Sequence, residues 1–262
     1  MCAGNFLFDA SRVSLGKKYR LRSIFKDDGK ALVVAMDHGM IGNVQLSPIL
    51  NIAEKVIKGG ADALLVTPAV ARYLIEKLSK KVPLVLSIPY DPQYVELAVK
   101  LSADAVKTTY FGKVPLDWDM MEKIWAVARA CDEWGMPYMV EIVPCDDSGK
   151  ILYDLEKVKQ AARIGGELGG DLVKTTYVGP SKAYRTVIES TFVPITIMGG
   201  PKMDTVKELF TVVKEAVDAG ATGGTIGRNI WQHEDPERMV KALISIIHEN
   251  KDIEDALKIV ER

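Results

Sequence analysis

The chain has 262 residues, 48% of them apolar, which is enough to bury a large core. Its 34 basic and 35 acidic residues are scattered, which argues against a nucleic-acid-binding protein. There is no apolar run long enough to cross a membrane, and because the start MCAGNFLFDASRV lacks the charged region and long apolar core of a signal peptide, we expect none. Cys2, Cys131 and Cys145 show neither metal-ligand spacing nor a disulfide pattern, which suits the reducing cytoplasm. From these observations together, we expect a cytoplasmic protein that binds neither nucleic acid nor membrane.

Short, nearly continuous apolar segments recur from Ala31 onward. Runs of this kind are typical of strands that are covered on both faces, as in a parallel sheet. The predicted strands cover residues 31–36, 61–66, 83–88, 103–110, 136–143, 171–178, 193–199 and 221–227.

Amphipathic segments separate these strands, with apolar residues at helical spacing and glycines near their ends. The clearest predicted helices cover residues 47–60, 68–81, 154–170 and 205–221. About eight strand–helix units in succession predict an α/β protein with a (β/α)8 TIM barrel. A doubly wound sheet is the weaker alternative, because it usually has fewer strands and often a glycine-rich dinucleotide turn, whereas MDHGMIG follows the first strand here.

No linker or change in composition divides the chain, so we expect one barrel domain over residues 31–262. Residues 1–30 form a predicted N-terminal extension. Within it, residues 15–25 (LGKKYRLRSIF) predict a short helix that closes the lower end of the barrel.

Two similar segments, ADAVKTTYFG from Ala103 and GGDLVKTTYVG from Gly169, each place a lysine inside an apolar strand. Burying an ammonium group costs free energy unless it is paired or used. Side chains alternate along a strand, so Lys107 shares a face with Ala105 and Thr109, and Lys174 shares one with Leu172 and Thr176. If these faces line the barrel, both ammonium groups point towards its centre.

Catalytic residues of a TIM barrel lie at the carboxyl ends of its strands. Asp37 and His38 follow the first strand, Lys107 lies in the fourth, Glu141 in the fifth and Lys174 in the sixth. A single strand lysine more often reaches solvent or pairs with a carboxylate. Four converging ionisable groups favour an active site instead, although an ion-pair network can produce the same pattern.

Glycine-rich segments follow the seventh and eighth strands, where TIM barrels frequently bind phosphate. They are IMGGPK, with Gly199, Gly200 and Lys202, and TIGRNIW, with Gly227 and Arg228. Glycine lets the backbone approach an anion closely, and Lys202 or Arg228 adds positive charge. The alternative is that these glycines only form tight turns.

MDHG, VKTTYVG, IMGGPK and GRNIWQ occur in this order, and over residues 18–250 the chain resembles the archaeal-type class I fructose-bisphosphate aldolases. That group includes aminodideoxyheptulosonate synthase and autoinducer-2 phosphate thiolase. The resemblance implies a Schiff-base lysine at Lys174, an acid/base role for Asp37 and a phosphate site at the four glycines and Arg228. It also implies a homo-oligomer built from pentameric rings, such as a decamer.

The chain departs from this group after the fifth strand. The group usually has a Trp-x-Tyr-Pro-Arg-like segment, in which the tyrosine donates a proton and the arginine holds the far end of the substrate. Here the segment is Glu141-Ile142-Val143-Pro144-Cys145, followed by two aspartates. Glu141 is the candidate replacement donor, since Asp, Lys, Glu and Lys on strands one, four, five and six resemble the animal-type class I aldolases. Because this arginine is missing, the sequence leaves open whether the substrate carries a second phosphate.

Cleavage of a carbon–carbon bond next to a ketone needs an electron sink, which a protonated lysine imine provides without metal or cofactor. The attacking amine must be neutral, and burial together with a neighbouring cation favours that form. Strand six adjoins strand seven and its phosphate loop, so Lys174 is the predicted nucleophile and Lys107 the neighbouring cation. Asp37 and Glu141 are the predicted proton-transfer groups, in an order that the sequence leaves open.

His38 and Thr176 are predicted to contact the substrate, although a loop hydrogen bond explains His38 equally well. The first predicted function is cleavage of fructose 1,6-bisphosphate to dihydroxyacetone phosphate and glyceraldehyde 3-phosphate, in glycolysis or gluconeogenesis. The alternatives are transaldolase-like or thiolase-like transfer on a sugar or dione monophosphate, and a phosphate-binding scaffold without catalysis. A zinc-dependent aldolase is not expected, because His38, His233 and His248 are dispersed.

Overall fold

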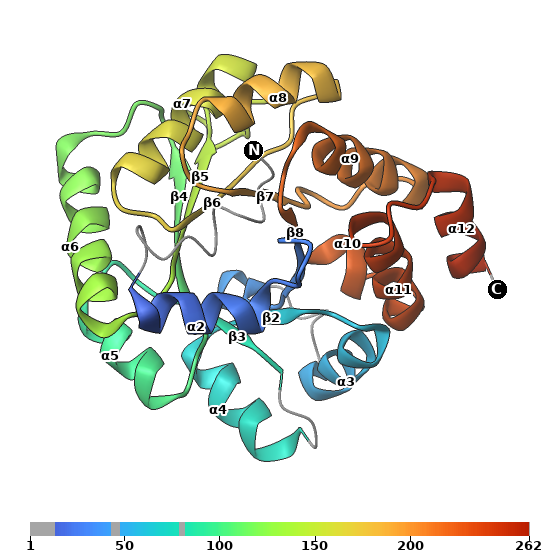
Figure 1. Cartoon of the computed structure of the whole chain (residues 1–262), viewed down its shortest axis with the longest axis horizontal. Helices are drawn as coiled ribbons and strands as arrows, with labels where there is room; N and C mark the ends of the chain where they lie inside the picture. The colour runs from blue at the N-terminus through green and yellow to red at the C-terminus, as the bar shows by residue number, and fades with distance from the viewer. Residues whose placement is uncertain (1–13, 43–47, 79–81, 262) are drawn as a thin grey trace.

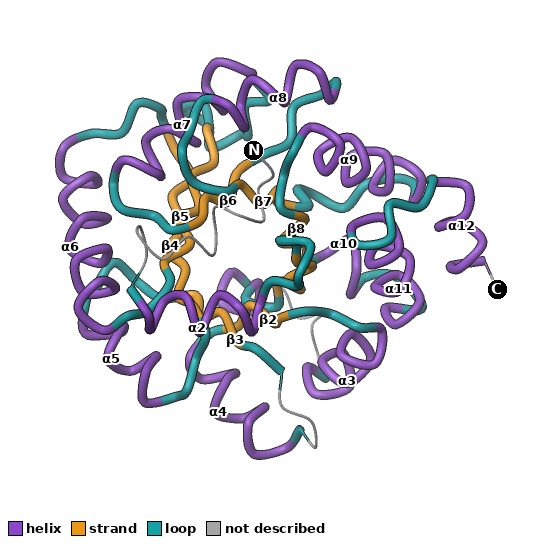
Figure 2. Tube along the Cα trace, in the orientation of Figure 1, coloured by secondary structure: helices purple, strands orange, loops and turns teal. Residues whose placement is uncertain are grey.

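The computed structural model describes residues 14–42, 48–78 and 82–261. Eight parallel strands pair in chain order, and β8 returns to β1, so the sheet is a closed barrel as predicted (Figures 1 and 2). The strands are β1 (Ala31–Ala35), β2 (Ala63–Val66), β3 (Leu84–Ser87), β4 (Ala105–Gly112), β5 (Tyr138–Pro144), β6 (Leu172–Thr175), β7 (Ile195–Met198) and β8 (Gly223–Ile226).

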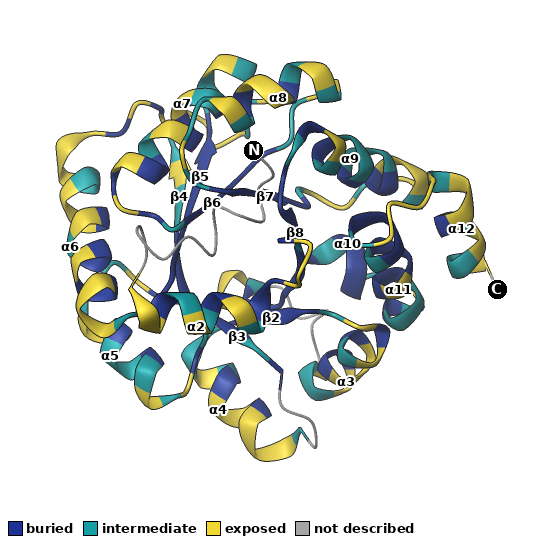
Figure 3. Cartoon of the chain, in the orientation of Figure 1, coloured by how far each residue is buried: buried dark blue, intermediate teal, exposed yellow. Residues whose placement is uncertain are grey.

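Helices surround this barrel and turn their apolar faces towards it, while their outer faces are exposed (Figure 3). In α3, for example, the buried residues include Ile52, Ala53 and Val56, which share one helical face. The helical elements are α2 (Leu15–Ile24), η1 (His38–Ile41), α3 (Ile49–Gly59), α4 (Pro68–Lys77), α5 (Gln93–Lys100), α6 (Trp118–Trp134), α7 (Leu155–Glu167), α8 (Ser181–Glu189), α9 (Val206–Ala219), α10 (Arg228–Trp231), α11 (Pro236–Ile247) and α12 (Ile253–Glu261).

The four predicted helices correspond to α3, α4, α7 and α9. α9 shows why its boundaries are readable from the sequence. Thr205 and Glu208 form a reciprocal capping box at its start, and Gly220 ends it with a φ of 113°, which glycine adopts without strain. The predicted helix over residues 68–81 ends earlier, at Lys77, and residues 79–81 lie outside the described residues, as does Ser47 of the predicted helix over 47–60.

Helix α2 closes the amino-terminal end of the barrel, as predicted. Leu21, Ile24 and Phe25 form one buried cluster with residues that point inward from β1 to β6. Lys17 of α2 is 3% exposed and forms ion pairs of 2.5 Å with Asp132 and 2.8 Å with Asp171. Burial opposes the charge on Lys17, but the two carboxylates outweigh it and raise its pKa. Residues 1–13 of the predicted extension, with Cys2, lie outside the described residues.

Aspartates repeat at the same end of the barrel, one before each of β2, β4 and β6. Each accepts a hydrogen bond from a backbone N–H at or next to the start of the preceding strand, over 2.7 to 3.0 Å. These bonds fix neighbouring strands in register where the sheet begins. The pairs of acceptor and donor are Asp62 with Leu32, Asp104 with Leu84 and Asp171 with Tyr138.

The barrel interior changes from apolar to polar along the strands. Residues near the closed end, such as Val33, Leu65 and Met139, are apolar and buried. Towards the carboxyl ends the buried inward side chains become polar: Ser87, Lys107, Glu141, Lys174, Thr196 and Thr225. Within the barrel interior, the buried polar side chains therefore lie towards the open end. In the described part of the chain, none of the helices is both long enough and apolar enough to cross a membrane.

Candidate active site

Four buried ionisable side chains form a continuous network at the open end of the barrel. Lys107 Nζ lies 3.0 Å from Asp37 Oδ2 and 2.8 Å from Glu141 Oε2. Lys174 Nζ lies 2.6 Å from Glu141 Oε1. Each of the four residues is less than 9% exposed. The predicted convergence of Asp37, Lys107, Glu141 and Lys174 is thus confirmed as an arrangement in space.

Strand register brings these groups together. Glu141 of β5 is directly opposite Thr109 of β4 on one side and Lys174 of β6 on the other. Thr109 Oγ1 donates to Glu141 Oε2 over 2.8 Å. Lys107 lies one layer deeper, and its long side chain reaches up to the same carboxylate. Glu141 consequently holds both ammonium groups.

Charges in this network stabilise one another. Burial opposes ionisation of Asp37 and Glu141, but the ammonium groups of Lys107 and Lys174 outweigh it and lower the pKa of each carboxyl to about 2. Burial likewise opposes the charge on Lys107, but Glu141 and Asp37 raise its pKa. At neutral pH both carboxylates are ionised, so neither holds a proton before a substrate binds.

His38 lies beside this network, at the start of η1. Its Nδ1 is 3.5 Å from Asp37 Oδ1, and its ring packs edge-on against Trp231 at a centroid distance of 5.6 Å. Burial lowers the pKa of His38, and the charges of Lys174, Arg228 and Lys107 lower it further against the opposing effect of Asp37. His38 is therefore neutral at pH 7 and presents one donor and one acceptor nitrogen.

A cavity of about 70 Å³ lies at this end of the barrel. Seven predicted site residues line it. Lys107 and Asp37 contact two of them: Lys107 pairs with Glu141, and Asp37 lies next to His38. The lining residues are Ala35, His38, Phe111, Glu141, Ile151, Lys174, Met198, Gly199, Gly200, Thr225, Gly227 and Arg228.

Two predicted substrate-binding residues do not line this cavity. Thr176 is 1% exposed, and its hydroxyl has no hydrogen-bond partner among the described residues. Lys202 is exposed and donates to the backbone carbonyl of Gln232 over 3.3 Å. Its ammonium group is therefore bonded to this carbonyl and does not line the cavity where the sequence placed it.

The glycine loops, residues 199–202 after β7 and 227–228 after β8, form one side of the cavity. A Cβ on Gly227 would lie 2.6 Å from His38 Cε1 and 2.8 Å from the Ala35 carbonyl oxygen, so only glycine fits there. A Cβ on Gly199 would lie 2.8 Å from an Ile226 side-chain carbon. Both glycines permit close packing that leaves the backbone accessible to a ligand.

Side chains after β8 tie the two glycine loops together. Asn229 Nδ2 donates to the Gly199 carbonyl over 2.8 Å and to the Pro201 carbonyl over 3.0 Å. Arg228 Nη2 donates to the Gly200 carbonyl over 3.1 Å, while its buried Nε has no partner in the described part of the chain. A guanidinium with a free buried donor next to a glycine backbone is suited to bind an anion such as phosphate.

Sequence reasoning missed several lining residues, above all Phe111 and Ile151. Phe111 shares one face of β4 with Lys107 and Thr109, because side chains alternate along a strand. It was missed because the predicted strand ended at residue 110. Ile151 reaches the cavity through a turn that pairs it with Cys145. Asp146 stabilises this turn by accepting N–H bonds from Ser148 and Lys150, so an Asp-Ser-Gly signal for it was present in the sequence.

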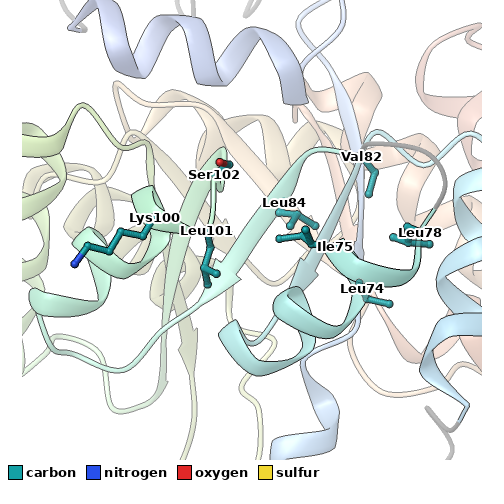
Figure 4. Close-up of a pocket in the computed structure, with 8 residues that line it drawn as sticks. All are labelled: Leu74, Ile75, Leu78, Val82, Leu84, Lys100, Leu101 and Ser102. Atoms are coloured by element: carbon teal, nitrogen blue, oxygen red, sulfur yellow. The ribbon is translucent and has the colours of Figure 1, made fainter.

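A larger cavity of about 440 Å³ lies outside the barrel, between α4, β3 and the end of α5 (Figure 4). Its walls are apolar apart from Lys100 and Ser102, and Lys100 is already paired with Glu96 at 2.6 Å. It contains none of the predicted site residues. The smaller cavity at the barrel mouth is therefore the candidate active site. The described residues also contain no cluster of three or more His, Cys, Asp or Glu side chains arranged as metal ligands.

Known proteins with similar sequences and structures include several aldolases. An uncharacterized aldolase of Saccharolobus solfataricus is 32% identical, over 94% of this chain and 100% of its own length. The 2-amino-3,7-dideoxy-D-threo-hept-6-ulosonate synthase 1 of Archaeoglobus fulgidus is 30% identical, over 93% of this chain and 95% of its own. A solved Schiff-base-forming fructose-1,6-bisphosphate aldolase superposes with a TM-score of 0.75 at 29% identity, over 88% of this chain and 99% of that chain.

Residues 31–233 match the family described as DeoC/LacD family aldolase, a range that runs from the first residue of β1 past the end of α10. It contains all four members of the charged network and both glycine loops. The chain therefore belongs to the DeoC/LacD aldolase family.

Proposed function

We propose that this protein is a class I aldolase that forms an imine between Lys174 and the ketone of a phosphorylated ketose. The observation that carries this proposal is the position of Lys174, which lines one cavity with both glycine loops and contacts Glu141 at 2.6 Å. The amine, a proton acceptor and an anion-binding backbone thus surround the same small space. Family membership and the Schiff-base-forming structural relative support the same chemistry.

Imine formation begins with transfer of a proton from Lys174 to Glu141, which frees the nitrogen lone pair. The nitrogen adds to the ketone carbon and gives a carbinolamine. Glu141 then returns the proton to the carbinolamine hydroxyl, which leaves as water. The product is an iminium ion, and Glu141 is again a carboxylate paired with Lys107.

Cleavage follows when a base removes the proton from the hydroxyl on the second carbon from the iminium carbon. The bond between that hydroxyl-bearing carbon and the carbon next to the iminium carbon breaks, its electron pair moves towards the iminium nitrogen to form an enamine, and an aldehyde leaves. We assign this proton to Asp37, because Glu141 is already bonded to the reacting nitrogen. Water then hydrolyses the remaining enamine after its protonation and restores the free amine.

The substrate phosphate binds at Gly199, Gly200, Gly227 and Arg228 in this proposal, with neutral His38 as a further hydrogen-bond partner. Fructose 1,6-bisphosphate, with a role in glycolysis or gluconeogenesis, is the first candidate. Sugar or dione monophosphates in a transaldolase-like or thiolase-like reaction are the second. One observation favours a monophosphate: Arg228 is the basic lining residue on the phosphate side, and the described lining residues from β4 and the β5–α7 segment include no lysine or arginine.

Borohydride reduction with dihydroxyacetone phosphate, followed by peptide mass spectrometry, tests the proposal. Borohydride reduces the imine and leaves the donor covalently attached. We expect the adduct on Lys174 and none in Lys174→Ala. An adduct on Lys107, or none in the wild-type protein, would contradict the assignment.

A further inference from the structure

The cavity has two chemically different sides. The glycine loops and Arg228 follow β7 and β8. Phe111 extends from β4, and Ile151 comes from the segment between β5 and α7. In the closed order of eight strands, β4 is diametrically opposite β8. Lys174 of β6 lies between these sides, so a substrate bound to it has one end at each.

Apolar groups cover the β4–β5 side. The pairing of β4 with β5 continues beyond Thr109 and Glu141 towards the open end. There Phe111 pairs with Val143, and Gly112 pairs with Pro144. Val143, Cys145 and Met198 form a buried cluster that packs against Ile151. Phe111, Ile151 and Met198 all line the cavity. Met198 belongs to β7, so we call Phe111 and Ile151, the two residues from the β4–β5 side, the apolar wall.

Charge is absent from this wall within the described chain. The ionisable lining residues are His38, Glu141, Lys174 and Arg228, and none of them belongs to it. Lys113, just beyond β4, is paired with Asp147 at 2.5 Å, and both side chains are largely exposed. A phosphate placed at the wall would find no cation there, whereas a methyl group would gain from contact with the apolar side chains.

We propose, on the basis of the function proposed above, that Phe111 and Ile151 determine substrate specificity. They select a substrate whose end remote from the phosphate is uncharged and apolar, such as a methyl group, over one that carries a second phosphate. The substrate class is therefore a monophosphorylated ketose or related ketone with a deoxy terminus.

Aldol addition of dihydroxyacetone phosphate to three aldehydes tests this selection. Lactaldehyde, glyceraldehyde and glyceraldehyde 3-phosphate have the same three-carbon chain and end in a methyl, a hydroxyl and a phosphate. In each reaction a C–H bond of the dihydroxyacetone phosphate hydroxymethyl carbon breaks, that carbon bonds to the aldehyde carbon, and the aldehyde oxygen gains a proton, so no other reactant is needed. We expect kcat/KM for lactaldehyde to exceed that for glyceraldehyde 3-phosphate by roughly tenfold or more. Equal values, the reverse order, or no turnover of any of the three would overturn the proposal.

Substitutions in the wall provide a second measurement. Phe111→Arg and Ile151→Arg add a cation where the wall has none, and each should shift the ratio of kcat/KM towards glyceraldehyde 3-phosphate by roughly tenfold or more. Phe111 is 51% exposed, so arginine fits there without burying its charge. Tyr73→Arg is the matched control, since this aromatic residue is 45% exposed on α4, outside the cavity. An unchanged ratio in both wall variants would count against the proposal.

Failure of this inference is distinguishable from failure of the proposed function. Borohydride trapping requires only dihydroxyacetone phosphate, which occupies Lys174 and the glycine loops and does not need the wall. Trapping on Lys174 with a preference for glyceraldehyde 3-phosphate would overturn the specificity proposal alone. Absence of trapping would overturn both.

Discussion

Lys107 and Lys174 share one carboxylate: Glu141 lies 2.8 Å from the Lys107 ammonium group through Oε2 and 2.6 Å from that of Lys174 through Oε1. A change on either lysine therefore alters the hydrogen bonds of the other through a single side chain. Asp37 extends the network from Lys107 and contacts it at 3.0 Å. The two carboxylates therefore have different contacts, and experiments can test whether they act in the different steps proposed above.

Glu141→Gln and Asp37→Asn should slow different steps. Glu141→Gln removes the carboxylate that accepts the Lys174 proton in the proposed mechanism. Borohydride trapping of dihydroxyacetone phosphate should therefore slow by about 10² to 10⁴-fold. Asp37→Asn should leave trapping nearly unchanged and slow carbon–carbon cleavage by a similar factor. Trapping rates and steady-state turnover of both variants check this. Equal loss of trapping in the two variants would show that the roles are not divided in this way.

Lys107→Met should destabilise the folded protein at pH 7. The substitution leaves Asp37 and the Oε2 atom of Glu141 buried without their cation, and breaking a buried pair costs about 3–5 kcal/mol. Urea denaturation of the variant and the wild-type protein measures the difference. Lys123→Met is the control, because it removes an exposed pair with Asp119 on α6 and should change stability little.

Acid should destabilise the protein through Asp37 and Glu141. Their folded-state pKa values of about 2 lie below the ordinary values of 3.8 and 4.5 that apply in the unfolded chain. Between pH 4.5 and 2 the unfolded chain therefore binds more protons, so the stabilisation is complete above this window and is lost as pH falls through it. Together the two groups contribute on the order of a few kcal/mol. Denaturation of Asp37→Asn between pH 6 and 3 should show a shallower decline than that of the wild-type protein; parallel curves would argue against the shift at Asp37.

Gly227→Ala should weaken phosphate binding. Its Cβ would lie 2.6 Å from His38 Cε1 and 2.8 Å from the Ala35 carbonyl, so the His38 ring and the loop must move. We expect KM for a phosphorylated substrate and the inhibition constant for inorganic phosphate to rise about tenfold or more, which corresponds to roughly 1.4 kcal/mol of lost binding. Gly39→Ala is the control, because its Cβ would meet nothing within 4 Å. Similar constants in both variants would show that close packing at position 227 does not shape the phosphate site.

The sequence was sufficient to predict the barrel and the charged network. Near-continuous apolar runs define parallel strands, and side-chain alternation places Lys107 and Lys174 on the inner face. Convergence at the open end then follows from topology. The lower-end helix was predictable for a similar reason, since Leu21, Ile24 and Phe25 give α2 and the residue after it an apolar side.

The rule that side chains alternate along a strand did not predict side-chain directions beyond the strand ends. Thr176 was assigned to the cavity by counting from Lys174, but β6 ends at Thr175, so the count no longer fixes its direction. Lys202 was chosen for its charge next to a glycine loop, but its hydrogen bond to Gln232 depends on contacts remote in sequence. Ile151 was missed because a turn, not a strand, carries it to the mouth.

Closure of the lower end by α2 has a kinetic consequence. With Leu21, Ile24 and Phe25 packed into the barrel, substrate and both products share the opening at the carboxyl ends of the strands. In the proposed mechanism the phosphorylated fragment stays covalently attached to Lys174 after cleavage, so the aldehyde must diffuse out first. Release is consequently ordered, and dihydroxyacetone phosphate should act as a competitive product inhibitor while the free aldehyde does not.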